Sequence, residues 1–165
     1  MASIKLEGLD KYQKELESLD RNITGILKRG VYDGAAVVAD AVRAAIGGLT
    51  TVSDFSGLKA YKRRTPTTLT EGQKAGLLSG LTLVEMQTSG SEVNTKLLFS
   101  GYNRVKTKKY PHGQPNIMIA ASVESGTSAT QKQPFMRSAA NKAKARARAA
   151  MEATVTSDIE RIMEG

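Results

Sequence analysis

The chain contains no cysteine and no tryptophan, and both absences limit what it can be. Without cysteine there is no disulfide, no thiolate metal ligand and no cysteine nucleophile, and such a composition suits a protein that folds in a reducing cytoplasm. Three phenylalanines and five tyrosines are the aromatic residues. A modest core built mostly from leucine, isoleucine, valine, alanine and methionine is therefore expected.

Residues that carry chemistry are also scarce. His112 is the single histidine, and the sequence marks no serine and carboxylate that would complete a catalytic triad with it. The carboxylates Asp54, Glu85 and Glu124 are isolated from one another, which argues against a metal site. The glycines form neither a phosphate-binding loop nor a dinucleotide fingerprint. We expect a protein that is not an enzyme and takes no cofactor or metal.

No long hydrophobic run is present either. The first seven residues lack the basic and apolar regions of a signal peptide, and no segment approaches about 18 consecutive apolar residues. The sequence therefore predicts a soluble protein without a membrane partner. Its 165 residues predict one domain, residues 1–165.

Apolar residues at three- and four-residue steps predict helix in two places. The first stretch covers roughly residues 9–46, as one or two amphipathic helices, because interior glycines such as Gly30 and Gly34 could break or kink it. Its alanine-rich second part predicts the close approach of another backbone, and Gly47-Gly48 predicts the C-terminal stop. A second long helix is expected to run from Pro134, in its first turn, to Met163.

Between these helices the sequence predicts a small sheet and long loops. Residues 49–80 and 101–116 lack periodicity and predict long irregular loops. Residues 81–87 and 93–99 flank a turn glycine and predict a β-hairpin, and the apolar run 117–123 predicts a third strand. The expected fold is α+β: a mainly antiparallel sheet of about three strands or more, covered on one face by the N-terminal helix and the long C-terminal helix.

The net charge is +8, and lysine and arginine gather in three places. A two-residue spacing puts Lys142 and Arg146 on one side of the second helix and Lys144 and Arg148 on another. A solvated face, an acidic protein neighbour and DNA phosphates are all compatible with these cations, but no motif for reading bases accompanies them. The clusters are Lys59, Lys62, Arg63 and Arg64; Arg104, Lys106, Lys108 and Lys109; and Lys142, Lys144, Arg146 and Arg148.

Two short motifs carry a resemblance to a known family. Val123-Glu124-Ser125-Gly126-Thr127 is followed by Pro134-Phe135-Met136-Arg137-Ser138-Ala139, which opens the charged C-terminal helix. This order resembles the neck and tail-completion proteins of tailed bacteriophages, in which an apolar-Glu-aromatic-Gly-Thr turn precedes a Pro-Phe-x-x-x-Ala helix start. The matching residues are Glu124, Gly126, Thr127, Pro134, Phe135 and Ala139.

The resemblance implies a structural virion protein that is assembled in the host cytoplasm and placed in the neck, needed for tail completion and head–tail joining. Its partners would be copies of itself in a ring, with sixfold symmetry favoured and twelvefold compatible. The head-closure proteins and the tail-terminator or tail-tube proteins would flank that ring. Phage DNA in its lumen could touch the cations without being read.

The motif residues also fit a fold-building role that needs no partner. Gly126 can adopt a positive φ at the strand exit, Thr127 or Ser128 can hydrogen-bond nearby backbone, and Phe135 can anchor the helix on the sheet. Direct contact with a neighbouring subunit is the other interpretation of this turn.

Two functions are therefore expected from the sequence. In the first, a virion assembly protein, neighbouring subunits order the long loops and present acidic surfaces to some cations, which charge reversal at Lys142 and Arg146 would test. The alternative is a nonspecific basic nucleic-acid-binding protein, for which counterion release predicts an affinity that falls steeply with salt.

Overall fold

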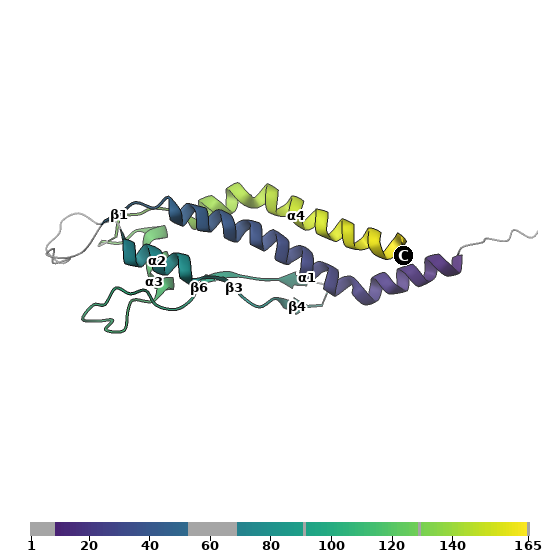
Figure 1. Ribbon diagram of the computed structural model, residues 1–165, viewed down its shortest axis with the longest axis horizontal. Coiled ribbons are helices and arrows are strands. Elements are labelled where there is room, and N and C mark those ends of the chain that lie inside the picture. The colour runs from purple at the N-terminus through teal and green to yellow at the C-terminus, as the bar shows by residue number, and fades with distance from the viewer. Residues whose placement is uncertain (1–8, 53–68, 91, 129, 165) are drawn as a thin grey trace, which may run out of the picture.

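The computed structural model describes residues 9–52, 69–90, 92–128 and 130–164. The basic cluster Lys59, Lys62, Arg63 and Arg64 lies outside these residues. Helix α1 (Leu9–Gly47) runs along the molecule between α4 (Met136–Glu164) on one side and a β-hairpin on the other (Figure 1). The short helices α2 (Glu71–Gly80) and α3 (Asn116–Ser125) lie near the C-terminal end of α1. The α+β class is confirmed.

The predicted N-terminal helix is confirmed as one element, because α1 runs without interruption although it bends towards its N-terminal end (Figure 1). Its interior glycines bring α4 close. A Cβ atom added at Gly30 would lie 2.7 Å from Cγ2 of Val155, and one at Gly34 would lie 2.3 Å from Cγ of Met151. Another backbone therefore does approach α1 closely, at positions where only glycine leaves room.

Polar contacts fix the register of α1 against α4. The buried carboxylate of Asp158 accepts a hydrogen bond from Nε of Arg29 at 2.5 Å and pairs with Nη1 of Arg161 at 3.0 Å. One helical turn away, Oγ1 of Thr154 donates to Oδ2 of Asp33 at 2.6 Å. Arg161 belongs to α4 itself, but a shift of one residue between the helices would take Arg29 from the buried Asp158 carboxylate and Asp33 from Thr154, which is costly for a buried carboxylate.

The predicted loop over residues 49–80 is wrong at residues 51–52 and 69–80, and residues 53–68 lie outside the residues that the structure describes. β1 (Thr51–Val52) pairs in parallel with β2 (Leu69–Thr70), and α2 follows at once. Thr70 and Gln73 form a capping box in which each side chain accepts the other's backbone N–H. The glycines that suggested a loop are packing positions, since a Cβ atom at Gly80 would lie 2.4 Å from the carbonyl oxygen of Ser100.

Lys74 of α2 caps the C-terminal end of α1. Its Nζ donates to the carbonyl oxygens of Gly47 at 2.8 Å and Leu49 at 3.0 Å. Carbonyls at a helix C-terminus have no intrahelical donor and carry partial negative charge, so an ammonium group stabilises them. The predicted stop at Gly47-Gly48 is confirmed, because α1 ends at Gly47.

The predicted hairpin is confirmed as two short antiparallel ladders. β3 (Leu81–Leu83) pairs with β6 (Leu97–Phe99), and β4 (Gln87–Ser89) pairs with β5 (Glu92–Asn94) nearer the tip. Between the ladders the N–H of Val84 donates to the carbonyl of Lys96 at 2.8 Å. α1 contacts both β3 and β5, α2 and α3 contact β6, and α4 packs on the far side of α1 (Figure 1).

The predicted third strand is wrong, because residues 117–123 belong to α3. A short apolar run without polar alternation does not distinguish a buried strand from a buried helix. The residues that α3 buries are spaced by three and four, as one face of a helix requires: Asn116, Ile119, Ala120 and Val123.

The core gathers where the C-terminal end of α1 meets the two short helices, the base of the hairpin and the start of α4. It is aliphatic apart from Phe99 and Phe135, as the composition predicts. Across the residues that the structure describes, no helix combines the length and the hydropathy needed to cross a membrane. The largest core side chains are Val42, Ile46, Leu49, Leu69, Leu77, Leu81, Phe99, Ile119, Val123 and Phe135.

Candidate functional site

Glu124 joins α3 to α4. Its Oε2 accepts the backbone N–H groups of Phe135 at 2.8 Å and Met136 at 2.9 Å, and its Oε1 accepts that of Arg137 at 3.1 Å. These are unpaired donors at the positive end of α4, where a carboxylate is stabilised. Partial burial alone would raise the pKa of Glu124, but the three N–H groups and the Arg137 charge outweigh it and lower the pKa.

The rest of the family-like motif shapes the same joint. Gly126 has φ of +76°, and a Cβ atom there would lie 2.8 Å from Cβ of Lys132, so the turn requires glycine. Thr127 closes the turn, its Oγ1 accepting the N–H of Thr130 at 2.9 Å and its own N–H donating to the Thr130 carbonyl at 2.9 Å. The predicted hydrogen bonding of Thr127 is confirmed. Gly126 follows the end of helix α3, so its predicted position at the end of a strand is wrong.

Phe135 and Ala139 are buried, and Pro134 stands just before them. The ring of Phe135 meets that of Phe99 edge to face with centroids 6.0 Å apart, which ties the start of α4 to β6. Pro134 precedes α4, which begins at Met136, so its predicted place in the first helical turn is wrong. The six motif residues thus lie together, and the contacts that the structure gives them build the fold.

Gln133 is a further residue of this joint that sequence reasoning missed. Its amide accepts the N–H of Thr50 at 2.9 Å and donates to the carbonyl of Thr50 at 3.2 Å. The segment after α1 is thereby held to the segment before α4. No local pattern predicts a bond between residues so far apart in sequence.

Replacing Glu124 by alanine removes the acceptor for three N–H groups of α4. We expect the free energy of unfolding to fall by about 0.5–2 kcal/mol, the range measured for losing a helix N-cap. Urea unfolding gives the value. Glu152→Ala is the matched control, because this carboxylate pairs with the exposed Arg148 and its loss should cost about 0.5 kcal/mol or less.

The effect of Glu124→Ala should depend on pH. A pKa that is lower in the folded state stabilises the fold above the ordinary value of 4.5, and this contribution is lost as the pH falls through the folded pKa. The stabilities of the parent and the variant should therefore converge in acid. A difference that stays constant from neutral to acidic pH would contradict the role given to the carboxylate.

The third basic cluster lies on α4 with all four side chains exposed. Ala143 and Ala147 between them are buried, so the cations flank a stripe that packs on α1. Arg148 is engaged by Glu152, at 2.7 Å, and this hydrogen bond and charge raise the pKa of its guanidinium. Within the described residues Lys142 and Arg146 have no ion-pair partner and are available to a ligand.

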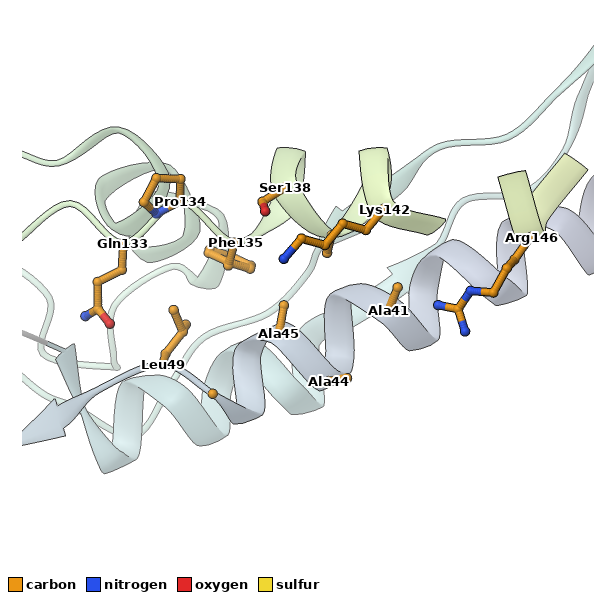
Figure 2. A pocket seen from close by; sticks show the side chains of 12 residues that line it. Ala41, Ala44, Ala45, Leu49, Gln133, Pro134, Phe135, Ser138, Lys142 and Arg146 are labelled. Carbon is orange, nitrogen blue, oxygen red and sulfur yellow. The ribbon is translucent and has the colours of Figure 1, made fainter. Parts of the chain in front are cut away.

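Lys142 and Arg146 border a groove between α4 and α1, with a volume of about 480 Å³. Figure 2 shows both side chains reaching from α4 towards α1 across the gap. Alanines of α1 form one wall, and Phe135 and Pro134 close one end. No carboxylate occurs among the twelve residues that line the groove within the described chain.

The second basic cluster, Arg104, Lys106, Lys108 and Lys109, lies in an exposed loop, as predicted. Buried Asn103 anchors its start by accepting the N–H of Val105 at 2.9 Å, and Nζ of Lys109 lies 5.6 Å from the ring centre of Tyr110. The loop projects beyond α2 and α3, on the side away from α4 (Figure 1). The structure does not bring the second and third clusters together.

The N-terminal part of α1 carries a surface that sequence reasoning did not foresee as exposed. Tyr12, Leu16 and Ile23 expose 53%, 45% and 39% of their surface. α1 continues beyond the C-terminal end of α4, so α4 does not cover the outermost turns of this surface (Figure 1). The apolar stripe that predicted the helix is thus left uncovered there by the described residues.

Metal-ligating side chains do not gather in the described part of the chain. His112 is exposed in the basic loop, and no three His, Asp or Glu side chains among residues 9–52, 69–90, 92–128 and 130–164 could hold a metal ion together. Comparison of the chain with family models, with curated proteins and with solved structures finds no match. The motif, the basic groove and the uncovered stripe are what remain to indicate a function.

Proposed function

We propose that this protein is a structural subunit of a tailed-phage virion that forms or joins a ring in the neck, between the head-closure proteins and the tail tube. The motif from Glu124 to Ala139 supports this, because it resembles that family and because its residues build one continuous joint between α3 and α4. A subunit that links two rings needs a stiff body and surfaces for neighbours. The packed helices α1 and α4 provide the stiff body.

The uncovered stripe on α1 is the observation that carries the proposal. Isolated exposed apolar residues are ordinary, but Tyr12, Leu16 and Ile23 are aligned on one face of a helix that continues past its packing partner. Aligned apolar side chains of this kind mark protein interaction sites. A subunit in a ring would cover them with its neighbour.

The proposal is tested by the mass of the purified protein, measured alone and after mixing with phage tails or particles that lack this component. We expect a ring, or uptake onto one end of the tail that restores infectivity. Apparent monomers in isolation are compatible with the proposal, because an adjacent ring can serve as the template. Failure both to assemble and to restore infectivity would reject it.

Nonspecific nucleic-acid binding is the second candidate, and it is favoured by Lys142 and Arg146, which pair with no carboxylate of the described residues. Each phosphate contact releases counterions, so affinity for duplex DNA should fall steeply with rising salt. Lys142→Glu with Arg146→Glu should then abolish most binding. A protein that binds DNA in this manner but is never taken up by tails would replace the neck proposal with this one.

A further inference from the structure

The N-terminal arm of α1, residues 10–23, carries a stripe with acidic edges. Because each residue turns about 100° around the axis, Leu16 and Ile23 lie within about 40° of Tyr12. On the same scale Glu15 lies about 60° to one side, Asp20 about 80° to the other, and Arg21 on the opposite face. Lys11 lies beyond Glu15 and pairs with it at 3.5 Å. The nearest residue on each side of the stripe is therefore a carboxylate, of which Asp20 is exposed and Glu15, with 13% of its side chain exposed, is largely covered.

The stripe continues the surface of α1 that α4 covers. Gly30 falls at about the same angle as Tyr12, since eighteen residues make five turns, and Gly30 is where Val155 of α4 packs. α4 ends at Glu164, while α1 goes on to Leu9 (Figure 1). The arm thus presents to solvent the side that elsewhere holds a helix.

The groove between α1 and α4 has the complementary character. Its wall consists of Ala41, Ala44 and Ala45, whose small side chains leave room for larger ones. Its cations Lys142 and Arg146 meet no carboxylate among the described residues that line the groove (Figure 2). An apolar helix face with acidic edges fits such a groove in both packing and charge.

We propose that the arm of one copy of this chain lies in the α1–α4 groove of a second copy. Leu16 and its neighbours on the stripe pack against the alanine wall, and the exposed carboxylate Asp20 faces Lys142 and Arg146. This inference rests on the proposed ring, for which it supplies the contact between subunits. The contact joins two different surfaces, the arm of one copy and the groove of the next. Head-to-tail contacts of this kind form a ring when the rotation between copies closes.

A chain cannot fill its own groove in this manner. Leu16 and Ala45 belong to the same helix and are 29 residues apart, which corresponds to about 44 Å along the axis. Any contact between the two surfaces must therefore come from another copy. Cross-linking can detect it without ambiguity, because the natural chain has no cysteine.

The test mixes two single-cysteine proteins, Leu16→Cys and Ser138→Cys, and oxidises the mixture. Both positions are exposed, and Ser138 borders the groove, so neither change should disturb folding. A disulfide needs Cα atoms about 4.4–6.8 Å apart, so only docked copies cross-link efficiently. Thr24→Cys, exposed but about 120° from Tyr12, replaces Leu16→Cys in the control mixture.

We expect at least about tenfold more 16–138 product than 24–138 product, the ratio that about 1.4 kcal/mol of preference gives. Equal yields would overturn the docking, and so would a dominant 16–16 product, which would show that arms pair with each other. Either result would leave the neck proposal standing if tails still take up the protein. Loss of uptake with a strong 16–138 product would reject the neck and keep the contact between copies.

An exchange of charges gives a second measurement. Asp20→Arg and Arg146→Asp should each reduce association between copies, and the two changes combined in one chain should restore part of it. Lys144→Asp, which removes the same charge outside the groove, should leave association unchanged. Reduction by all three single changes without recovery in the double variant would mean that only net charge matters, and would overturn the pairing.

Discussion

Replacing Phe135 by alanine should lower the free energy of unfolding by about 3–5 kcal/mol, the usual cost of truncating a buried phenylalanine. The side chain is 3% exposed and meets Phe99 edge to face, so its removal opens a cavity between α4 and β6. For a chain of this size each kcal/mol lowers the melting temperature by about 2–4 °C. Urea and thermal unfolding both report the change.

Tyr102→Ala is the control for that loss. Tyr102 is also aromatic but is 66% exposed, and its backbone bridge to Pro115 does not need the side chain. Its truncation should change stability by about 0.5 kcal/mol or less. If Phe135→Ala were as mild as Tyr102→Ala, the ring would not anchor α4, and the motif would have to act through a partner instead.

The long helices could be predicted from the sequence because their apolar residues keep one spacing over many turns. The sequence does not predict α2, because its glycines weaken that pattern, although Thr70 and Gln73 stand at the spacing of a capping box, which is a recognisable signal. For residues 117–123 the sequence predicts a strand, because the run is short and mainly apolar. In both cases contacts with the rest of the fold decide what local preference leaves open.

The motif residues were identified from the sequence, but the way they work was not. Glu124 bonds to backbone groups 11 to 13 residues ahead, across a turn whose path depends on Gly126. No side-chain pattern marks a backbone donor, so a carboxylate that caps a distant helix has no signature in sequence. Likewise, an amphipathic pattern tells which face of α1 is apolar, but it does not tell where α4 stops covering that face.

Replacing Gly34 by leucine should lower the free energy of unfolding by about 1–3 kcal/mol, the cost of overpacking a close interface. A Cβ atom at Gly34 would lie 2.3 Å from Cγ of Met151 and 3.1 Å from the carbonyl oxygen of Ala147. The methionine side chain can move, but the backbone of α4 moves only if the helices separate. The Arg29–Asp158 hydrogen bond, at 2.5 Å, would be stretched with it.

Gly25→Leu tests whether the contact or the helix is responsible. Gly25 is exposed in the same helix, and a Cβ atom there would meet only the end of the Arg29 side chain, at 3.7 Å. Leucine forms helix better than glycine by up to about 1 kcal/mol, so this variant should be more stable than the parent. A lower free energy of unfolding for Gly34→Leu together with a higher one for Gly25→Leu, both measured by urea unfolding, would show that Gly34 is needed for the packing of α1 on α4. Stabilisation at both would mean that α4 does not approach α1 as closely as the structure shows, and the groove beside it would then lose its wall.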